Sequence, residues 1–418
     1  MKEKKFDKNK SAGITLIALV VTIIVLLILA GISVQMLTGE NGILQKAGEA
    51  KENTEQSQIE EQIKLASMEA AANITETVYN DGEKEIKIPA GFAPTRIEGE
   101  DTVEKGLVIT DSKGNEFVWV VVPNDGTGPN YTGVEENNNI DYIKIAKALA
   151  EYSGSTLSNN PTSLADHLPA GEGVPDYTNE YKDVLKSIYQ NGGFWVGRYE
   201  TGIQETEKAT ISARVGTSNS KEYPTEGDVA VIKENVQPYT WVKWGQAIEL
   251  AQGILPTTNS SNHTNLLMGV QWDLVLKFIG KSGDSSDWGN YSNSVFDLKP
   301  GSHYAKMSSW TLSTTWKAYN EDEPGFVESS EKKRQLANGN GILYTTGANI
   351  TNNSQKNISD IAGNVWEWTI ERATIPGSPC SYRGGSFINT GSVSPASDRV
   401  YYTPTYSISS ISFRVALY

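Results

Sequence analysis

The chain has very little cysteine and histidine for its length. Its 418 residues include one cysteine, Cys380, and three histidines, His167, His263 and His303. A single cysteine excludes an intramolecular disulfide and a zinc site built from several thiolates. The histidines are far apart in the sequence and show no metal-ligand spacing. The fold must therefore rely on a packed core, or on a metal that is held by oxygen atoms.

Basic residues are also in the minority. Lys and Arg together number 36 against 50 Asp and Glu, which gives a net charge of −14. Proteins that bind nucleic acid in general need basic patches that displace counterions from phosphate, so we expect no nucleic-acid partner. Hydrophobic residues make up 38% of the chain, which is enough for a packed core and argues against global disorder.

The N-terminal region combines a basic start with a long uncharged run. Lysines stand at positions 2, 4, 5, 8 and 10, and no charged residue occurs from Ser11 to Gly39. Within this run, Ile14–Val34 is long enough to cross a bilayer, which takes roughly 20 residues. The lysines predict a cytoplasmic N-terminus, with the bulk of the chain outside the cell. A secretory signal is the alternative, but its apolar region is shorter, about 7–15 residues, and ends in a small-residue cleavage site.

The residues around Gly13 resemble the type IV prepilin signal. In that family a peptidase cuts after the glycine and the new N-terminus is methylated, which here implies processing between Gly13 and Ile14. The resemblance implies a prepilin peptidase, and pilin subunits, as partners. Ile14 stands where the family usually has Phe, and Ala18 where it usually has Glu. A plain single-span anchor without processing remains the alternative.

A helical stalk is predicted after the span. Apolar residues recur at helical spacing at Ile59, Ile63, Ala66 and Ala70, within an otherwise polar segment. We therefore expect a helix over 43–72 that continues the membrane helix, with a solvated linker as the alternative.

The region after residue 84 is predicted to mix short strands, helices and loops. Val108–Thr110 and Glu116–Val121 flank a turn and predict a β-hairpin, and Gly193–Thr201 predicts a strand rich in aromatic residues. Helices are predicted at Ile143–Tyr152, at Thr178–Tyr189 with Thr178 as N-cap, at Trp241–Gln252 and at Leu267–Ile279. Surface loops are predicted at 124–142, 284–293 and 320–334.

Three blocks near the C-terminal end carry a second resemblance. They are Asp360–Glu371, Tyr382–Phe387 and Ser412–Val415, which read DIAGNVWEWTIE, YRGGSF and SFRV. In this order they resemble the formylglycine-generating enzyme (sulfatase-modifying factor) family, which has a C-type-lectin-like fold. The resemblance covers roughly residues 105–418 and implies an α+β domain. It implies structural roles for Trp366, Trp368, Arg383, Gly384, Gly385 and Arg414.

The same resemblance implies a structural calcium site in the first block. By position, its ligands would be the side chains of Asp360 and Glu367 and the backbone carbonyls of Gly363 and Val365. Oxygen ligands of this kind suit calcium rather than zinc or copper. The alternative is that Glu367 only forms hydrogen bonds within its own loop.

The family's oxidation chemistry is not expected here. It implies copper held by two thiolates that follow the Arg-Gly-Gly-Ser block, whereas residues 386–418 contain no cysteine and Cys380 precedes that block. A single thiolate cannot form a two-sulfur copper site. The histidines also lack the spacing of the iron site in the family's ergothioneine branch. We expect neither copper nor iron, and no catalytic residue; a metal-dependent oxidase acting on protein cysteine remains the alternative.

The segment between the second and third blocks is rich in tyrosine and serine. Tyrosine offers a large contact area at small entropic cost, and binding loops use both residues. We predict a ligand-binding surface in 386–412, formed by Asn389, Ser392, Ser394, Asp398, Arg399, Tyr401, Tyr402 and Tyr406. This arrangement resembles the variable proteins of diversity-generating retroelements, which also have a lectin-like fold. An ordinary loop without a dedicated ligand is the alternative.

Together these observations predict four parts: a basic leader (1–13), a transmembrane prepilin-like helix (14–37), a helical stalk with linker (38–83) and a C-type-lectin-like outer domain (84–418). We expect a membrane-anchored, pilin-like protein of the cell surface. Its outer domain would bind an unknown protein or glycan ligand without catalysis. A structural minor pilin is a further alternative.

Overall fold

The computed structural model describes most of the chain beyond residue 42. The described residues are 43–71, 76–155, 162–171, 173–204, 229–255, 262–282, 286, 288–308, 311–312, 316–320, 326–328, 334–336, 341–349, 354–373 and 375–418. The predicted leader, membrane span and processing site at Gly13 and Ile14 lie outside them. Within these described segments, no helix is both long and apolar enough to cross a membrane.

Helix α2 spans Ile43–Ala71, so the helix predicted over 43–72 is confirmed. By contacts the chain divides into two compact units, of which the second covers Lys64–Tyr418 and so begins before residue 84. The last turns of α2 belong to this second unit. There Lys64 pairs with Glu116, and the Ser67 hydroxyl donates to the carbonyl of Thr95 at 3.1 Å.

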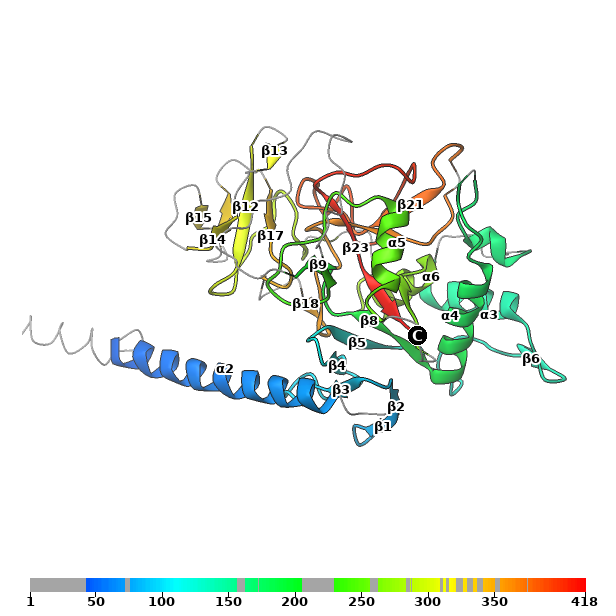
Figure 1. Ribbon diagram of the computed structural model, residues 1–418, viewed down its shortest axis with the longest axis horizontal. Coiled ribbons are helices and arrows are strands. Elements are labelled where there is room, and N and C mark those ends of the chain that lie inside the picture. The colour runs from blue at the N-terminus through cyan, green and yellow to red at the C-terminus, as the bar shows by residue number, and fades with distance from the viewer. Residues whose placement is uncertain are drawn as a thin grey trace, which may run out of the picture. The chain divides into compact units, whose positions relative to one another are not determined.

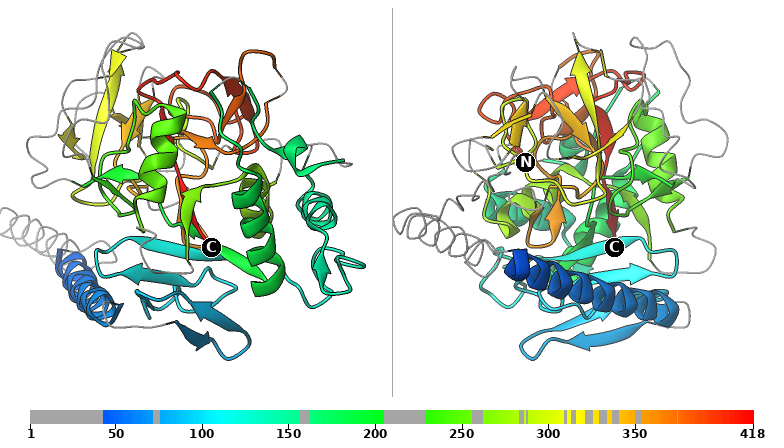
Figure 2. Two further views of the ribbon diagram at one scale, coloured as in Figure 1. Left: turned by 45° about the vertical axis from the view of Figure 1, so that its right-hand side comes forward. Right: turned by 90° about the vertical axis from the view of Figure 1, so that its left-hand side faces the viewer.

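The second unit contains a six-stranded antiparallel sheet in the order β11-β24-β8-β5-β4-β3. Figure 1 shows β3, β4, β5 and β8 in neighbouring positions, and the C-terminal end of the chain lies against this sheet in Figure 2. The predicted hairpin is confirmed as β4 and β5, with Val108 opposite Val118. The strands are Phe92–Pro94 (β3), Val108–Asp111 (β4), Glu116–Val121 (β5), Gly193–Gly197 (β8), Thr264–Leu266 (β11) and Val415–Leu417 (β24).

A four-stranded sheet in the order β22-β21-β20-β23 carries the three blocks. Strand β23 runs parallel to β20, whereas β20, β21 and β22 are antiparallel neighbours. The third block is divided between two strands, β23 and β24, which belong to different sheets and are separated only by Arg414. The strands are Trp366–Thr369 (β20), Cys380–Arg383 (β21), Arg399–Tyr402 (β22) and Ile411–Phe413 (β23).

The predicted helices form, but their starts differ. Thr178 is the first residue of its helix and Tyr177 is the N-cap, so the prediction of Thr178 as N-cap is wrong. Trp241 has a φ of +62°, which an α-helix does not tolerate, and the helix predicted from Trp241 begins three residues later. The helices are Tyr142–Ser153 (α3), Leu164–His167 (η1), Thr178–Asn191 (α4), Trp244–Gln252 (α5) and Gly269–Phe278 (α6).

Short strands occupy much of the remaining chain. Two of them form a small hairpin inside the predicted loop 124–142. In Figure 1, β12, β14, β15 and β17 group together, away from α3 and α4. These strands are Thr77–Asn80 (β1), Glu85–Ile88 (β2), Glu135–Glu136 (β6), Asn139–Ile140 (β7), Gly202–Ile203 (β9), Ala230–Val231 (β10), His303–Ser308 (β12), Thr311–Leu312 (β13), Lys317–Ala318 (β14), Phe326–Glu328 (β15), Arg334–Leu336 (β16), Ile342–Tyr344 (β17), Ser354–Gln355 (β18) and Ile358–Ser359 (β19).

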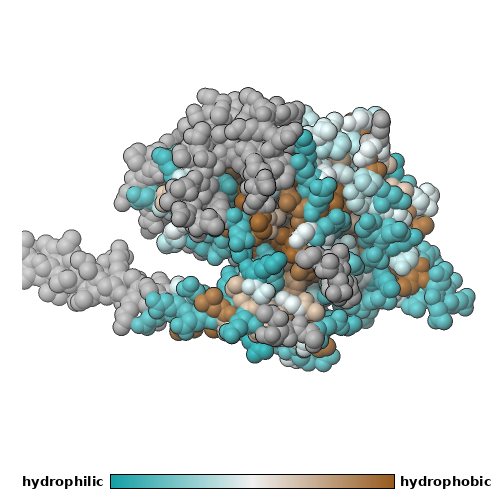
Figure 3. Space-filling model, viewed as in Figure 1, coloured by the Kyte–Doolittle hydropathy of each residue, from teal (hydrophilic) through white to brown (hydrophobic). Residues whose placement is uncertain are grey.

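One large core joins the two sheets with the helices α3–α6. On the face shown in Figure 3, hydrophilic residues cover most of the described surface. Large hydrophobic side chains that are exposed come from separate segments, such as Val78 on β1, Ile375 after β20 and Val393 near β22. The last of these lies in the predicted ligand-binding segment.

Candidate functional site

Arg414 connects the two sheets. Its side chain is fully buried and donates to both carboxylate oxygens of Glu367, at 2.7–3.2 Å. It also donates to the carbonyls of Gly197, at the end of β8, and Ser359. The guanidinium thus binds a side chain of one sheet and a backbone carbonyl of the other, which fixes their relative position. Arg414, for which the family resemblance implies a structural role, is thus buried and paired.

The turn before β20 depends on glycine. Gly363 has a φ of +74°, a conformation that favours glycine. A Cβ atom there would also lie 2.1 Å from the carbonyl oxygen of Asn290. The neighbouring Asn364 accepts from the Asn290 amide at 2.7 Å and donates to Glu200 and to the carbonyl of Tyr344. This amide network holds the turn on which the predicted calcium ligands lie.

Three buried carboxylates lie around this turn: Glu200, Asp360 and Glu367. Burial, with the charge of Asp360, raises the pKa of Glu200 well above its usual range, and one of its oxygens has no hydrogen-bond partner among the described residues. Burial also raises the pKa of Asp360 to about 7, against the lowering effect of the hydrogen bond from the Gly347 N–H, at 2.6 Å. Burial therefore favours the protonated forms of Glu200 and Asp360, while Arg414 balances the charge of Glu367.

These buried carboxyl groups bear on the predicted calcium ion. The described residues contain no group of three His, Cys, Asp or Glu side chains that could hold a metal by themselves. Both oxygens of Glu367 are bound by Arg414. The residues fit a cation only if Asp360, the unpartnered oxygen of Glu200 and backbone carbonyls such as those of Gly363 and Val365 supply the ligands.

A second buried ion network includes Arg399, which belongs to the predicted binding segment. Arg383 on β21 and Arg399 on β22 are directly opposite each other, and like charges in this position repel. Glu371 accepts from both arginines, at 3.0 Å and 2.5 Å. Asp273 on α6 also accepts from both, at 2.6 Å in each case. Burial disfavours a charged Asp273, but the two guanidinium groups outweigh this effect and lower its pKa.

The first part of the segment 386–412 contacts the rest of the domain through backbone hydrogen bonds and one close approach at a glycine. Gly385 has a φ of +76°, and a Cβ atom there would lie 2.3 Å from the carbonyl oxygen of Ser394, so the segment folds back over this glycine. The Trp272 indole donates to the carbonyl of Ala396 at 2.9 Å. The N–H of Ser292 donates to the carbonyl of Asn389 at 2.8 Å. These contacts anchor the segment to the domain at Asn389 and Ala396.

The exposed part of the segment includes one tyrosine. Tyr402 is 39% exposed, and its ring stacks on that of Tyr406 with centroids 3.7 Å apart. Val393 is 75% exposed, and Ser392 is exposed beside it. The side chains that reach solvent are therefore aromatic, apolar and hydroxylic.

The eight predicted ligand-binding residues have different surroundings. Ser394 is buried, and Arg399 belongs to the ion network, with only 11% of its side chain exposed. These two residues support the segment instead of facing solvent. Ser392 and Tyr402 are exposed, and the others, which are partly buried, are Asn389, Asp398, Tyr401 and Tyr406.

The functional arrangement includes residues that sequence reasoning did not select. Glu371 ends the first block and Asp273 lies in the helix predicted at Leu267–Ile279, but nothing in the sequence showed that they converge. Glu200 and Asn290 were also missed. The available signal was a charged or amide residue inside a hydrophobic run, as at Asp273, because such a residue needs a buried partner.

Cys380 is fully buried on β21, and burial raises the pKa of its thiol to about 12. Because thiolates are the reactive form, we expect a disulfide-forming thiol reagent at about pH 8 to label the folded chain at least a hundredfold more slowly than the unfolded chain. Labelling kinetics with and without denaturant measure this ratio. Equal rates would contradict the burial of Cys380 and would restore thiolate chemistry as an option.

Comparison with known proteins places the chain in context. A family model described as "Sulfatase-modifying factor enzyme 1-like domain" matches residues 177–418, which is more than half of the chain. A search of curated protein sequences finds no relative.

Two solved structures are similar to parts of the chain. The crystal structure of CarF is 16% identical, over 54% of this chain and 85% of CarF, with a TM-score of 0.29. The variable protein 1 of Treponema denticola is 12% identical, over 82% of this chain and 99% of that protein, with a TM-score of 0.20. Both superpose loosely on this chain.

Proposed function

Because the chain belongs to the family with a sulfatase-modifying factor enzyme 1-like domain, we propose that it retains the scaffold of this family for binding instead of catalysis. The proposed protein is anchored in a membrane by its N-terminal segment, in the manner of a pilin, and displays this domain at the cell surface. The domain binds a protein or glycan ligand through the segment 386–412.

One observation supports this proposal above the others. The segment 386–412 is anchored to the domain at Asn389 and Ala396, yet it exposes Ser392, Val393 and Tyr402. A surface that is ordered before binding loses less conformational entropy in the complex, which favours affinity. The buried ion pairs of Arg383, Arg399, Glu371 and Asp273 also hold the segment, because Arg399 belongs to it.

The chemistry of the chain favours binding over oxidation. The copper site that the family resemblance implies needs two thiolates, and the chain has one cysteine, whose thiol is buried. The uncharged run after five N-terminal lysines supports the membrane anchor, and the residues around Gly13 support processing by a prepilin peptidase.

The test begins with the purified chain on a glycan array and against a peptide display library. We expect ligands whose affinity falls about tenfold or more when Tyr402 is replaced by alanine, because an exposed tyrosine at the centre of a contact commonly contributes this much. Val78→Ala is the matched control, since Val78 is 58% exposed on β1, outside the segment. Titration calorimetry with the recovered ligands measures the effect.

Two outcomes would contradict the proposal. In the first, Val78→Ala weakens the recovered ligands as strongly as Tyr402→Ala does. In the second, the chain supplied with copper and oxygen converts a sulfatase-type cysteine peptide to formylglycine at an enzymatic rate. The second result would establish the oxidase alternative.

A further inference from the structure

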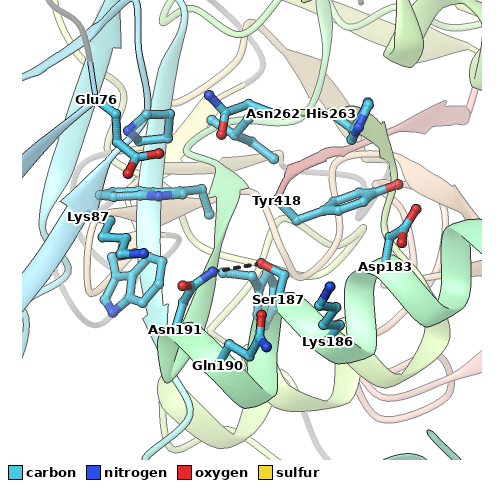
Figure 4. A pocket seen from close by; sticks show the side chains of 15 residues that line it. Glu76, Lys87, Asp183, Lys186, Ser187, Gln190, Asn191, Asn262, His263 and Tyr418 are labelled. Carbon is cyan, nitrogen blue, oxygen red and sulfur yellow. Dashed lines mark hydrogen bonds between the residues drawn. The ribbon is translucent and has the colours of Figure 1, made fainter. Parts of the chain in front are cut away.

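A pocket of about 400 Å³ lies against the six-stranded sheet, apart from the segment 386–412. Its walls come from β5, β8, the end of β24, helix α4 and the residues around β2. Figure 4 shows the labelled side chains of α4 on one side of the pocket and Glu76 and Lys87 on another. Tyr418 lies between the α4 side chains and the pair Asn262 and His263. No residue of the segment 386–412 lines it.

Aromatic side chains form part of the wall. Trp119 and Trp195 are opposite each other on β5 and β8, with ring centroids 5.0 Å apart. Among the described residues, the indole N–H of Trp119 has no hydrogen-bond partner, although it is buried. Tyr418 and His263 exchange backbone hydrogen bonds of 2.8 and 3.0 Å, and their rings are in contact. Aromatic ring surface therefore makes up part of the pocket wall.

Helix α4 contributes a polar wall. Its lining residues Asp183, Lys186, Ser187, Gln190 and Asn191 recur at helical spacing and share one face of the helix. The Asn191 amide donates to the Ser187 hydroxyl at 3.1 Å, as the dashed line in Figure 4 shows. Amide and hydroxyl groups both donate and accept hydrogen bonds. This wall therefore suits a ligand whose own groups both donate and accept hydrogen bonds.

The charges of the pocket balance. Two carboxylates, from Glu76 and Asp183, line it together with two ammonium groups, from Lys87 and Lys186. An anionic or cationic ligand would meet as many repulsive as attractive groups. A neutral ligand with many hydroxyl groups would meet donors and acceptors on every side.

From these features we propose that the pocket binds a neutral saccharide. The rings of Tyr418 and His263 pack against the C–H groups of a sugar, and Gln190, Asn191 and Asn262 bind its hydroxyl groups. This site is separate from the segment 386–412, so the domain carries two binding surfaces.

The experiment uses the full chain and saturation-transfer NMR. The probes are glucose, galactose, mannose and N-acetylglucosamine, with glucuronic acid, glucosamine and trialanine as charged or peptidic counterparts. We expect at least one neutral sugar to bind, at least about tenfold more tightly than the counterparts. The double variant Gln190→Ala, Asn191→Ala should weaken that sugar about tenfold or more.

Two controls make the result specific. Asn179→Ala changes an exposed residue on α4 that does not line the pocket and should leave sugar binding unchanged. Tyr402→Ala should also leave it unchanged, so failure here and failure of the proposed function are distinguishable. Three results would overturn the proposal: no binding of any neutral sugar, tighter binding of a charged probe or of trialanine, and sugar binding that survives the double variant.

Discussion

Replacement of Arg414 by methionine is expected to lower the free energy of unfolding by about 3–5 kcal/mol, the usual effect of breaking a buried ion pair on one side. Methionine fills much of the volume, but Glu367 is then left buried without its cation. The carbonyls of Gly197 and Ser359 lose their donors in the same step. Urea unfolding followed by tryptophan fluorescence measures the loss.

A double variant separates charge from packing. When Glu367 is replaced by glutamine together with Arg414→Met, no uncompensated charge remains at this position, and we expect part of the lost stability to return. A matched control is Arg372→Met, because Arg372 pairs with Asp166 at the surface and its side chain is 44% exposed. That variant should change the free energy of unfolding by no more than about 1 kcal/mol. A similarly small effect of Arg414→Met would show that Arg414 does not connect the two sheets.

The parts of the fold that sequence reasoning predicted well depend on local patterns. The β4–β5 hairpin follows from two apolar runs around a turn, and α2, α3, α4 and α6 follow from helical spacing. The assignment of Arg414 as a buried structural residue came from a motif, since position within the third block carries that information. Helix starts were less accurate. The start of α5 was missed because Trp241 takes a left-handed conformation that no local sequence pattern predicts.

The parts that could not be predicted depend on long-range pairing. Arg399 was expected to face a ligand, because a charged residue in a polar segment is usually exposed. Its partner Asp273 lies 126 residues earlier in the sequence, and Glu371 is separated from it by 28 residues. Only the folded chain brings these groups together.

The partners of Glu367 could not be predicted from the sequence either. Its position in the first block predicted a carboxylate with a structural role, either as a calcium ligand or as a hydrogen-bonding group. The sequence did not indicate that Arg414 would bind both of its oxygens, nor that Glu200 would lie beside Asp360. The question of calcium therefore centres on Asp360 and Glu200.

Asp360 should make the stability of the chain depend on pH. Its pKa is about 7 in the folded chain and 3.8 as its ordinary value. Between these values the folded chain holds a proton that the unfolded chain has released, so the free energy of unfolding falls as pH rises. The fall amounts to at most about 4 kcal/mol and ends near pH 7. Urea unfolding at a series of pH values measures it.

Replacement of Asp360 by asparagine should remove most of this slope, because asparagine cannot ionise. Glu367, Arg414 and Lys299 also act on Asp360 electrostatically, and the Asp360→Asn variant leaves all three in place. Calcium addition tests whether Asp360 and Glu200 hold the predicted calcium ion. If they do, added calcium should raise the melting temperature of the native chain near neutral pH, because a ligand that binds only the folded state stabilises it. The melting temperature of the Asp360→Asn variant should not rise. A slope that persists in Asp360→Asn would assign the titration to another group, and equal melting temperatures with calcium and with a chelator would contradict the calcium site.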